Sequence, residues 1–211
     1  MIKADALMAA FFTRELTARG LPERDYSGRF WWPYRQQVVK QQPALKHDVT
    51  NVRRVTYGFA LKSLGLDEPE SHALAEQALA YFLKVRSDFS VAPETLAFLE
   101  QLAGKYPLVA ITNGNVDVER IGLAPFFKHV FMAGDGNLQK PDVDMFSQAF
   151  EQLSIAPSQL LHVGDCGRAD IVGALRAGCQ AAWLNKYKVG KPIKVLPHIE
   201  LTDVEQLLLL P

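Results

Sequence analysis

Residues 160–178 read LLHVGDCGRADIVGALRAG, in which an apolar run, an acidic turn and a helical pattern follow one another directly. The run Leu160–Val163 suits a strand that is buried on both faces, as strands of parallel sheets are. Similar runs occur at Leu108–Ile111, Val130–Ala133 and Ala181–Leu184. Helical patterns lie between several of these runs, notably at Met145–Leu153 and Asp170–Ala177. Strands that alternate with helices predict a parallel α/β sheet, which we place in a domain of residues 91–211.

Residues 1–90 show only helical spacing. Leu7, Phe11 and Leu16 recur along one helical face, and Gly20 is a plausible end of that helix. Further helices are expected at Tyr34–Gln41, at Val49–Leu64 and from about Pro69 onward. Four helices with short connections predict a helical bundle, so residues 1–90 are expected to form a separate domain.

Composition excludes several classes of protein. The chain has 211 residues, of which 48% are hydrophobic, and its 23 Lys and Arg balance its 23 Asp and Glu. This balance argues against a nucleic-acid-binding protein, which needs a basic excess. Cys166 and Cys179 match no metal or redox spacing. The apolar stretch Ala6–Phe12 has neither the length of a membrane span nor a signal-peptide cleavage site, so we expect a cytoplasmic protein.

Polar residues follow the first apolar run. Thr112-Asn113-Gly114-Asn115 presents a hydroxyl group and backbone N–H groups in a glycine-containing turn. Such a turn is a good phosphate-binding site at the carboxyl end of a strand. On its own, this stretch is equally well explained as an ordinary polar turn.

Charged residues follow the second and third runs. Lys140-Pro141 lies in the loop after the second run, where an ammonium group could neutralise a phosphoryl group. The third run ends in Gly164-Asp165, and Asp170 comes five residues later. Two carboxylates at one strand end suit a hard cation such as Mg²⁺. Taken singly, Lys140 is better explained as a surface residue, Asp165 as a turn residue and Asp170 as a helix N-cap.

In this order, the sequence segments VAITNGN, QKPD and HVGD, with Asp170 after them, resemble the second, third and fourth motifs of the haloacid dehalogenase-like (HAD) hydrolase superfamily. The resemblance covers about residues 91–205. It implies a Rossmann-like core with a helical bundle cap. It also implies that Thr112, Asn113 and Gly114 bind the phosphate of a substrate, that Lys140 is catalytic, and that Asp165 and Asp170 hold Mg²⁺.

One motif of the superfamily has no counterpart. Members begin their core with a central strand that ends in Asp-x-Asp, whose first Asp is the nucleophile. Here only Met1–Lys3 precede the first helix, so we expect the central first strand and the nucleophile to be absent from this sequence. Asp142-Val143-Asp144 has the spacing, but it follows Lys140-Pro141 and opens a helical pattern. Three explanations stay open: a start further upstream, a pseudoenzyme whose sheet has closed across the gap, or a strand from another chain.

The resemblance implies Mg²⁺-dependent hydrolysis of a small phosphorylated metabolite through an aspartyl-phosphate, and the chain as given is expected to be inactive. It is similar to bacterial phosphatases that act on flavin mononucleotide or on phosphorylated ribitylaminouracil. The alternatives are a 2-haloacid dehalogenase and a noncatalytic phosphate-ligand-binding protein. In the predicted cap, the cluster Arg29–Arg35 either contacts substrate or places Trp31 and Trp32 in the bundle core with its arginines facing water. No membrane or nucleic-acid partner is indicated, and the oligomeric state is not specified.

Overall fold

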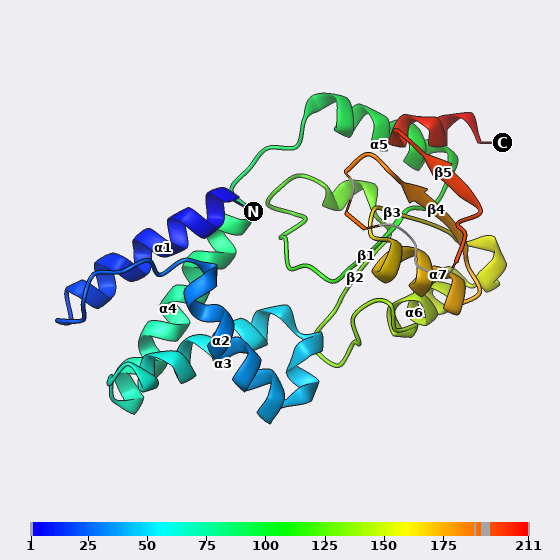
Figure 1. Cartoon of the computed structure of the whole chain (residues 1–211). Coiled ribbons are helices and arrows are strands. Elements are labelled where there is room, and N and C mark those ends of the chain that lie inside the picture. Colours follow the sequence, from blue (N-terminus) through cyan, green and yellow to red (C-terminus); the bar gives the residue numbers. More distant parts are fainter. Residues whose placement is uncertain (1, 188, 191–194, 211) are drawn as a thin grey trace. The chain divides into compact units, whose positions relative to one another are not determined.

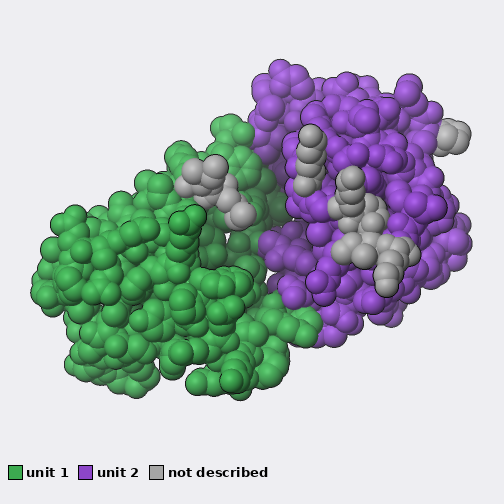
Figure 2. Space-filling model, in the orientation of Figure 1, with its two compact units in different colours: residues 1–90, 115–121 green, residues 91–114, 122–211 purple. Residues whose placement is uncertain are grey.

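The computed structural model describes residues 2–187, 189–190 and 195–210. The chain divides into two compact units, one of residues 1–90 and 115–121 and the other of residues 91–114 and 122–211 (Figure 2). The sequence-based boundary placed residues 115–121 in the second domain, whereas the structure places them in the first unit. Hydrogen bonds explain the difference, because the Asn115 carboxamide donates to the Thr50 hydroxyl at 3.0 Å and the Asp117 N–H donates to the Ser87 hydroxyl at 3.0 Å.

The first unit is helical, as the sequence predicts. Its elements are α1 (Ile2–Thr17), α2 (Gly28–Gln41), a 3₁₀ helix (Pro43–His47), α3 (Val49–Ser63) and α4 (Glu68–Arg86) (Figure 1). Helix α2 begins at Gly28, six residues before the predicted start, and Pro33 lies inside it, where its missing N–H removes one helical hydrogen bond. Helix α3 begins at the N-cap Asp48, whose carboxylate accepts the N–H groups of Thr50 and Asn51.

Aromatic side chains fill the core of the first unit. The ring of Phe12 lies 4.2 Å from that of Trp31 and 4.8 Å from that of Tyr57, measured between centroids. The Trp31 indole also donates a hydrogen bond to the Tyr26 carbonyl at 2.9 Å. Trp32 is 53% exposed, and the Arg35 guanidinium lies 5.4 Å from its ring. The prediction that both tryptophans fill the core is therefore correct for Trp31 and wrong for Trp32, because neighbouring residues of a helix face different sides.

The second unit alternates helices and strands. Its elements are α5 (Pro93–Lys105), β1 (Val109–Thr112), β2 (His129–Met132), α6 (Asp144–Leu153), β3 (Leu161–Gly164), a π-helical turn (Gly167–Ile171), α7 (Val172–Arg176), β4 (Gln180–Leu184) and β5 (Ile199–Leu201). Short 3₁₀ helices lie at Ala124–Phe126, Pro157–Gln159 and Val204–Leu209. Strand β5 was not predicted from the sequence, because it is only three residues long and Glu200, at its centre, is exposed.

The strands form two parallel sheets. One contains β1 and β2, with Val109 opposite His129, and the other has the order β3-β4-β5, with Leu161 opposite Gln180. Within the described residues, β1 and β3 are not hydrogen-bonded to each other. These are the two strands between which the family pattern places its central strand.

Two apolar layers cover the faces of β4. Ala181 and Trp183 pack with the residues of α6 and α7, whereas Ala182 and Leu184 pack with α5 and the C-terminal 3₁₀ helix. This alternation follows from the two-residue period of a strand. The parallel α/β prediction is thus confirmed, because every strand pair in both sheets is parallel. Among the described residues, no helix has both the length and the apolar character needed to cross a membrane.

Candidate functional site

The turn after β1 holds Lys140 in place. The Asn113 carboxamide donates to the Lys140 carbonyl at 2.9 Å and accepts the Lys140 N–H at 2.7 Å. The Thr112 hydroxyl oxygen accepts the Gly114 N–H at 2.9 Å. Asn113 therefore positions Lys140, while the Thr112 hydroxyl donates no hydrogen bond to any residue that the structure describes and can donate to a ligand.

Lys140 is a buried cation, with only 8% of its surface exposed. Its ammonium lies 2.7 Å from Asp170 Oδ1 and donates to the Ile111 carbonyl at 2.5 Å. It thus joins the end of β1 to the residues that follow β3. Lys140 and Asp170, which follow different strands in the sequence, therefore lie in contact at the carboxyl ends of β1 and β3.

Asp170 lies inside the π-helical turn rather than at a helix N-cap. Its Oδ2 accepts the Cys166 N–H at 2.9 Å, and its Oδ1 lies 3.3 Å from His162 Nε2. Burial by itself raises the pKa of Asp170, but the hydrogen bond from His162 and the nearby Lys140 ammonium outweigh burial and hold this pKa well below its usual range. Asp170 is therefore ionised at neutral pH.

Two further residues at this site were not singled out from the sequence. Burial lowers the pKa of His162, which is therefore neutral at pH 7 and donates from Nε2 to Asp170. Gly164 is the other, because a Cβ added there would lie 2.3 Å from Asp170 Cγ. The polar residue inside an apolar strand and the glycine before Asp165 are the signals that could have revealed them.

Asp165 lies beside this network but outside it. Its carboxylate is half-buried and makes no hydrogen bond or ion pair with the described part of the chain. Its carbonyl accepts the Trp183 indole N–H at 3.1 Å, which fixes the backbone at this position. Asp165 therefore offers a carboxylate to a ligand.

The side chains at this strand edge suit one direct carboxylate contact to Mg²⁺ and one contact through water. Across residues 2–187, 189–190 and 195–210, no group of three or more His, Cys, Asp or Glu side chains converges as a metal site. Mg²⁺ is commonly held by one or two carboxylates, with water and substrate phosphate as its other ligands. Asp165 suits direct coordination, whereas both oxygens of Asp170 have protein partners and suit contact through water.

Two other acidic residues, Asp144 and Asp5, have structural roles. Asp144 lies in the first turn of α6, and its carboxylate accepts the Leu138 N–H at 3.1 Å. The expectation that Asp142–Asp144 opens a helix is therefore confirmed for Asp144. Asp5, in α1, accepts the Gly28 N–H at 3.0 Å.

Arg53 of α3 is a partly buried cation that was not predicted from the sequence as a candidate site residue. Its guanidinium carbon lies 3.7 Å from the centroid of the Phe82 ring, and its Nη1 donates to the Tyr57 hydroxyl at 3.2 Å. Its Nε is buried without a hydrogen-bond partner among the described residues. Its neighbour Arg54 is charged as well, so the sequence gives no signal that distinguishes Arg53.

A family model of the haloacid dehalogenase-like hydrolases matches residues 9–178. The chain belongs to this hydrolase family. The match includes Thr112, Lys140, Asp165 and Asp170, so the sequence-based family assignment is confirmed.

Relatives of this hydrolase act on different substrates. It is 38% identical to the 5-amino-6-(5-phospho-D-ribitylamino)uracil phosphatase YigB of Escherichia coli, over 82% of this chain and 74% of that protein. It is 29% identical to a phosphoserine phosphatase of Thermus thermophilus, over 74% of this chain and 64% of that protein. Among solved structures, a 2-haloacid dehalogenase of Pseudomonas syringae pv. Tomato superposes with a TM-score of 0.87 at 32% identity, over 98% of this chain and 88% of that one.

Proposed function

We propose that this hydrolase contributes the phosphate-binding, charge-neutralising and metal-binding residues for hydrolysis of a small phosphate monoester. One observation carries the proposal: the Lys140 ammonium lies beside Asp170 and Ile111, at the strand edge that also presents Thr112 and Asp165. The similarity to YigB supports the phosphate ester of a ribitylaminouracil as the substrate class.

The residues have separate roles in this proposal. The Thr112 hydroxyl donates to a phosphate oxygen, and the Lys140 ammonium neutralises charge that develops on the transferring phosphoryl group. Asn113 keeps the ammonium in place through its two hydrogen bonds to the Lys140 backbone. The domain assignment of 1–90 as cap and 91–211 as core belongs to the same proposal.

Asp165 would hold Mg²⁺ directly and Asp170 would hold it through water. When bound, the ion supplies positive charge that offsets the negative charge of the phosphate. His162 and the Cys166 amide keep the Asp170 carboxylate oriented.

The nucleophile is the missing part of this proposal. Among the described acidic residues, Asp144 and Asp5 bond to backbone N–H groups elsewhere in the chain, and Asp170 is held by Lys140. We therefore propose that the 211-residue chain by itself turns over phosphate esters poorly and that a strand-borne aspartate completes the reaction.

Two other functions have specific support. The similarity to a 2-haloacid dehalogenase favours halide release, which would proceed without a metal ion. The Thr112 turn and the Lys140 ammonium, for which no nucleophile is assigned, favour a protein that binds phosphate esters without hydrolysing them. Dependence on Mg²⁺ separates the first alternative from the proposal, and binding without turnover identifies the second.

The test is an assay of phosphate release from the phosphorylated ribitylaminouracil and from p-nitrophenyl phosphate, with Mg²⁺ and with EDTA. It is run on the 211-residue chain and on the same chain extended upstream by a strand that ends in Asp-x-Asp. We expect Mg²⁺-dependent release from the extended protein and its loss in the Asp165→Asn variant. Asp135→Asn is the matched control, because Asp135 is exposed in a loop.

Each outcome assigns one function. Release that persists in EDTA or in Asp165→Asn contradicts the metal assignment. Chloride release from 2-chloropropionate without phosphate release supports the dehalogenase. Calorimetric binding of orthophosphate by the extended protein, without turnover, supports the binding protein.

A further inference from the structure

The Arg53 guanidinium in α3 has a hydrogen-bond donor that the protein leaves unused. Its Nε is buried, and across the described residues it is the single buried side-chain nitrogen or oxygen without a hydrogen-bond partner. Buried polar groups nearly always have a partner, because a donor that loses its water without replacement destabilises the fold. The exception therefore indicates a partner that the described chain does not supply.

Arg53 also lacks an opposite charge. Within the part of the chain that the structure describes, its guanidinium forms no ion pair. The next residue differs, because Arg54 pairs with Glu76 at 3.4 Å and donates to Asn51 Oδ1 at 2.6 Å. A charge held partly out of water is normally compensated by an opposite charge. The uncompensated charge of Arg53 therefore favours an anionic partner over a neutral one.

Two neighbours hold the guanidinium in one orientation. Helices α3 and α4 pack against each other (Figure 1), and Phe82 of α4 lies 3.7 Å from the guanidinium carbon, measured to the centroid of its ring. Nη1 donates to the Tyr57 hydroxyl at 3.2 Å. Both Phe82 and Tyr57 are buried. The guanidinium is thus fixed by core side chains, which reduces the conformational entropy lost when a ligand binds.

Neither neighbour compensates the charge of Arg53. Burial raises the pKa of Tyr57, and the opposing effect of the nearby Arg53 charge is smaller. Tyr57 is therefore a neutral phenol at pH 7. The ring of Phe82 offers only a cation–π contact, which is weaker than pairing with an anion. The guanidinium is held in place but keeps its full charge.

The unused edge of the guanidinium defines the chemistry of a ligand. With Nη1 directed at Tyr57, the remaining donors are Nε and Nη2. Nη2 bonds to no described residue and is not among the buried unpaired atoms, so it is in contact with solvent. Nε and Nη2 present two nearly parallel N–H groups, which match the two oxygens of a carboxylate or phosphate group. Phe82 lies over a face of the guanidinium, so the ligand approaches this edge in the guanidinium plane.

We propose that Arg53 is the anion-binding residue of a ligand site on the first unit, which takes the carboxylate or phosphate group of a small molecule. One oxygen accepts a hydrogen bond from Nη2 at the surface, and the other accepts from Nε, which thereby gains its missing partner. Tyr57 and Phe82 are positioning residues. The proposal concerns binding by the first unit alone and does not depend on the phosphatase reaction.

The test follows the Nε–H resonance of Arg53 in proton–nitrogen correlation NMR spectra of the 211-residue protein. The resonance is assigned from its absence in Arg53→Lys. Sodium acetate and sodium phosphate are titrated separately at constant pH and ionic strength, because salt screens exposed charges. We expect one or both anions to shift this resonance saturably and to slow exchange of its proton with water. The anion that saturates at the lower concentration identifies the ligand group as a carboxylate or a phosphate.

An internal control and two variants sharpen the result. The Nε–H resonance of Arg54 should not move, because this donor already bonds to Asn51 Oδ1 at 3.1 Å. Arg53→Lys keeps the charge but loses the two parallel donors, so it should bind the anion at least about tenfold more weakly. Its binding is measured from the amide resonances of α3. Tyr57→Phe releases Nη1 and should weaken binding less than Arg53→Lys does.

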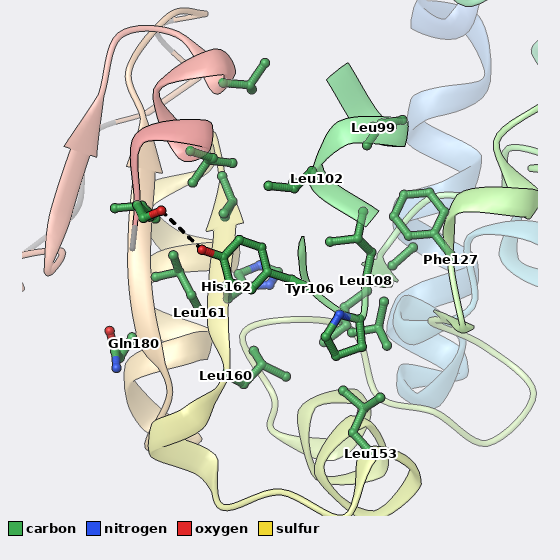
Figure 3. Close-up of a pocket in the computed structure, with 18 of the residues that line it drawn as sticks. Leu99, Leu102, Tyr106, Leu108, Phe127, Leu153, Leu160, Leu161, His162 and Gln180 are labelled. Atoms are coloured by element: carbon green, nitrogen blue, oxygen red, sulfur yellow. Dashed lines mark hydrogen bonds between the residues drawn. The ribbon is translucent and has the colours of Figure 1, made fainter. Parts of the chain in front are cut away.

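Tyr106→Phe is the matched control for Tyr57→Phe. The Tyr106 hydroxyl donates to the Leu210 carbonyl at 3.3 Å in the second unit, and Figure 3 shows this bond as a dashed line. Its removal should leave the Arg53 titration unchanged. Thermal unfolding of each variant without added anion shows whether it is folded.

Three outcomes overturn the proposal. An Arg53 resonance that neither anion shifts, or that sodium chloride shifts equally, would mean that this residue binds no oxyanion. Unchanged binding in Arg53→Lys would mean that charge alone attracts the anion. Shifts by phosphate at the amides of Thr112–Gly114 without any at Arg53 would support the proposed phosphate site and contradict this one, so the two proposals fail separately.

Discussion

At the scale of single residues, Lys140 and Asp170 depend on each other. Both are buried, and each supplies the charge that makes burial of the other tolerable. Removing one partner of such a pair leaves an uncompensated buried charge, which costs about 3–5 kcal/mol. The site chemistry and the stability of the second unit therefore rest on the same contact.

Lys140→Met is expected to lower the free energy of unfolding by about 3–5 kcal/mol, measured by urea denaturation. Adding Asp170→Asn should recover part of this loss, because the neutral amide needs no cation. Lys62→Met is the matched control, since Lys62 pairs with Glu68 at the surface and should change stability by less than about 1 kcal/mol. Equal losses in Lys140→Met and Lys62→Met would show that burial of the pair has no energetic consequence.

Gly164→Ala is expected to lower the free energy of unfolding by about 1–3 kcal/mol, because the new methyl group meets the Asp170 side chain. Gly104→Ala, in α5, meets nothing within 4 Å and should instead stabilise the protein by roughly 0.5–1 kcal/mol. Chemical denaturation of the two variants gives the comparison. A Gly164→Ala protein as stable as the wild type would mean that Asp170 moves freely.

Some of these site residues could be predicted from the sequence, whereas the contacts between them could not. Thr112, Lys140, Asp165 and Asp170 were recognisable because each follows an apolar run at a spacing that resembles a family motif. The role of Asn113 was not recognisable, because its bonds to Lys140 join residues from different loops. Contacts between distant segments depend on the packed fold and leave no local pattern.

At the scale of elements, local signals located most helices. Helix α3 begins at Val49 as predicted, because Asp48 is an N-cap whose carboxylate accepts two backbone N–H groups. The prediction placed the start of α2 at Tyr34, whereas the helix begins at Gly28 and contains Pro33, a residue that is disfavoured inside helices. Strand β5 was missed because its burial comes from packing against α5, which its alternating short sequence does not indicate.

Asp48→Ala is expected to destabilise the first unit by about 0.5–2 kcal/mol, because the Thr50 and Asn51 N–H groups lose their acceptor. Ser27→Ala is the matched control. Ser27 is also an N-cap, but its side chain makes no capping hydrogen bond. Urea denaturation followed by far-ultraviolet circular dichroism gives both values, and a larger loss in Ser27→Ala would contradict the capping role of Asp48.

At the scale of the whole molecule, each unit has its own core. Leu61 belongs to the aromatic core of the first unit, and Met145 to the layer between the sheets and α6 in the second. Both side chains are fully buried. Separate cores allow the two units to open separately, as cooperative units of larger proteins commonly do.

Leu61→Ala and Met145→Ala form a matched pair for this test, since each removes a fully buried apolar side chain at a cost of about 2–5 kcal/mol. Hydrogen exchange measured by mass spectrometry should show faster exchange in α3 and α4 for Leu61→Ala, and in α6 and the strands for Met145→Ala. Hydrogen exchange in the segment 115–121 tests whether the two units open separately. It follows β1 in the chain but bonds to Thr50 and Ser87, so its exchange should rise with Leu61→Ala and stay unchanged with Met145→Ala. Exchange in this segment that instead rises together with exchange in β1 would contradict the division. Faster exchange throughout the protein in both variants would mean that it opens as a single cooperative unit.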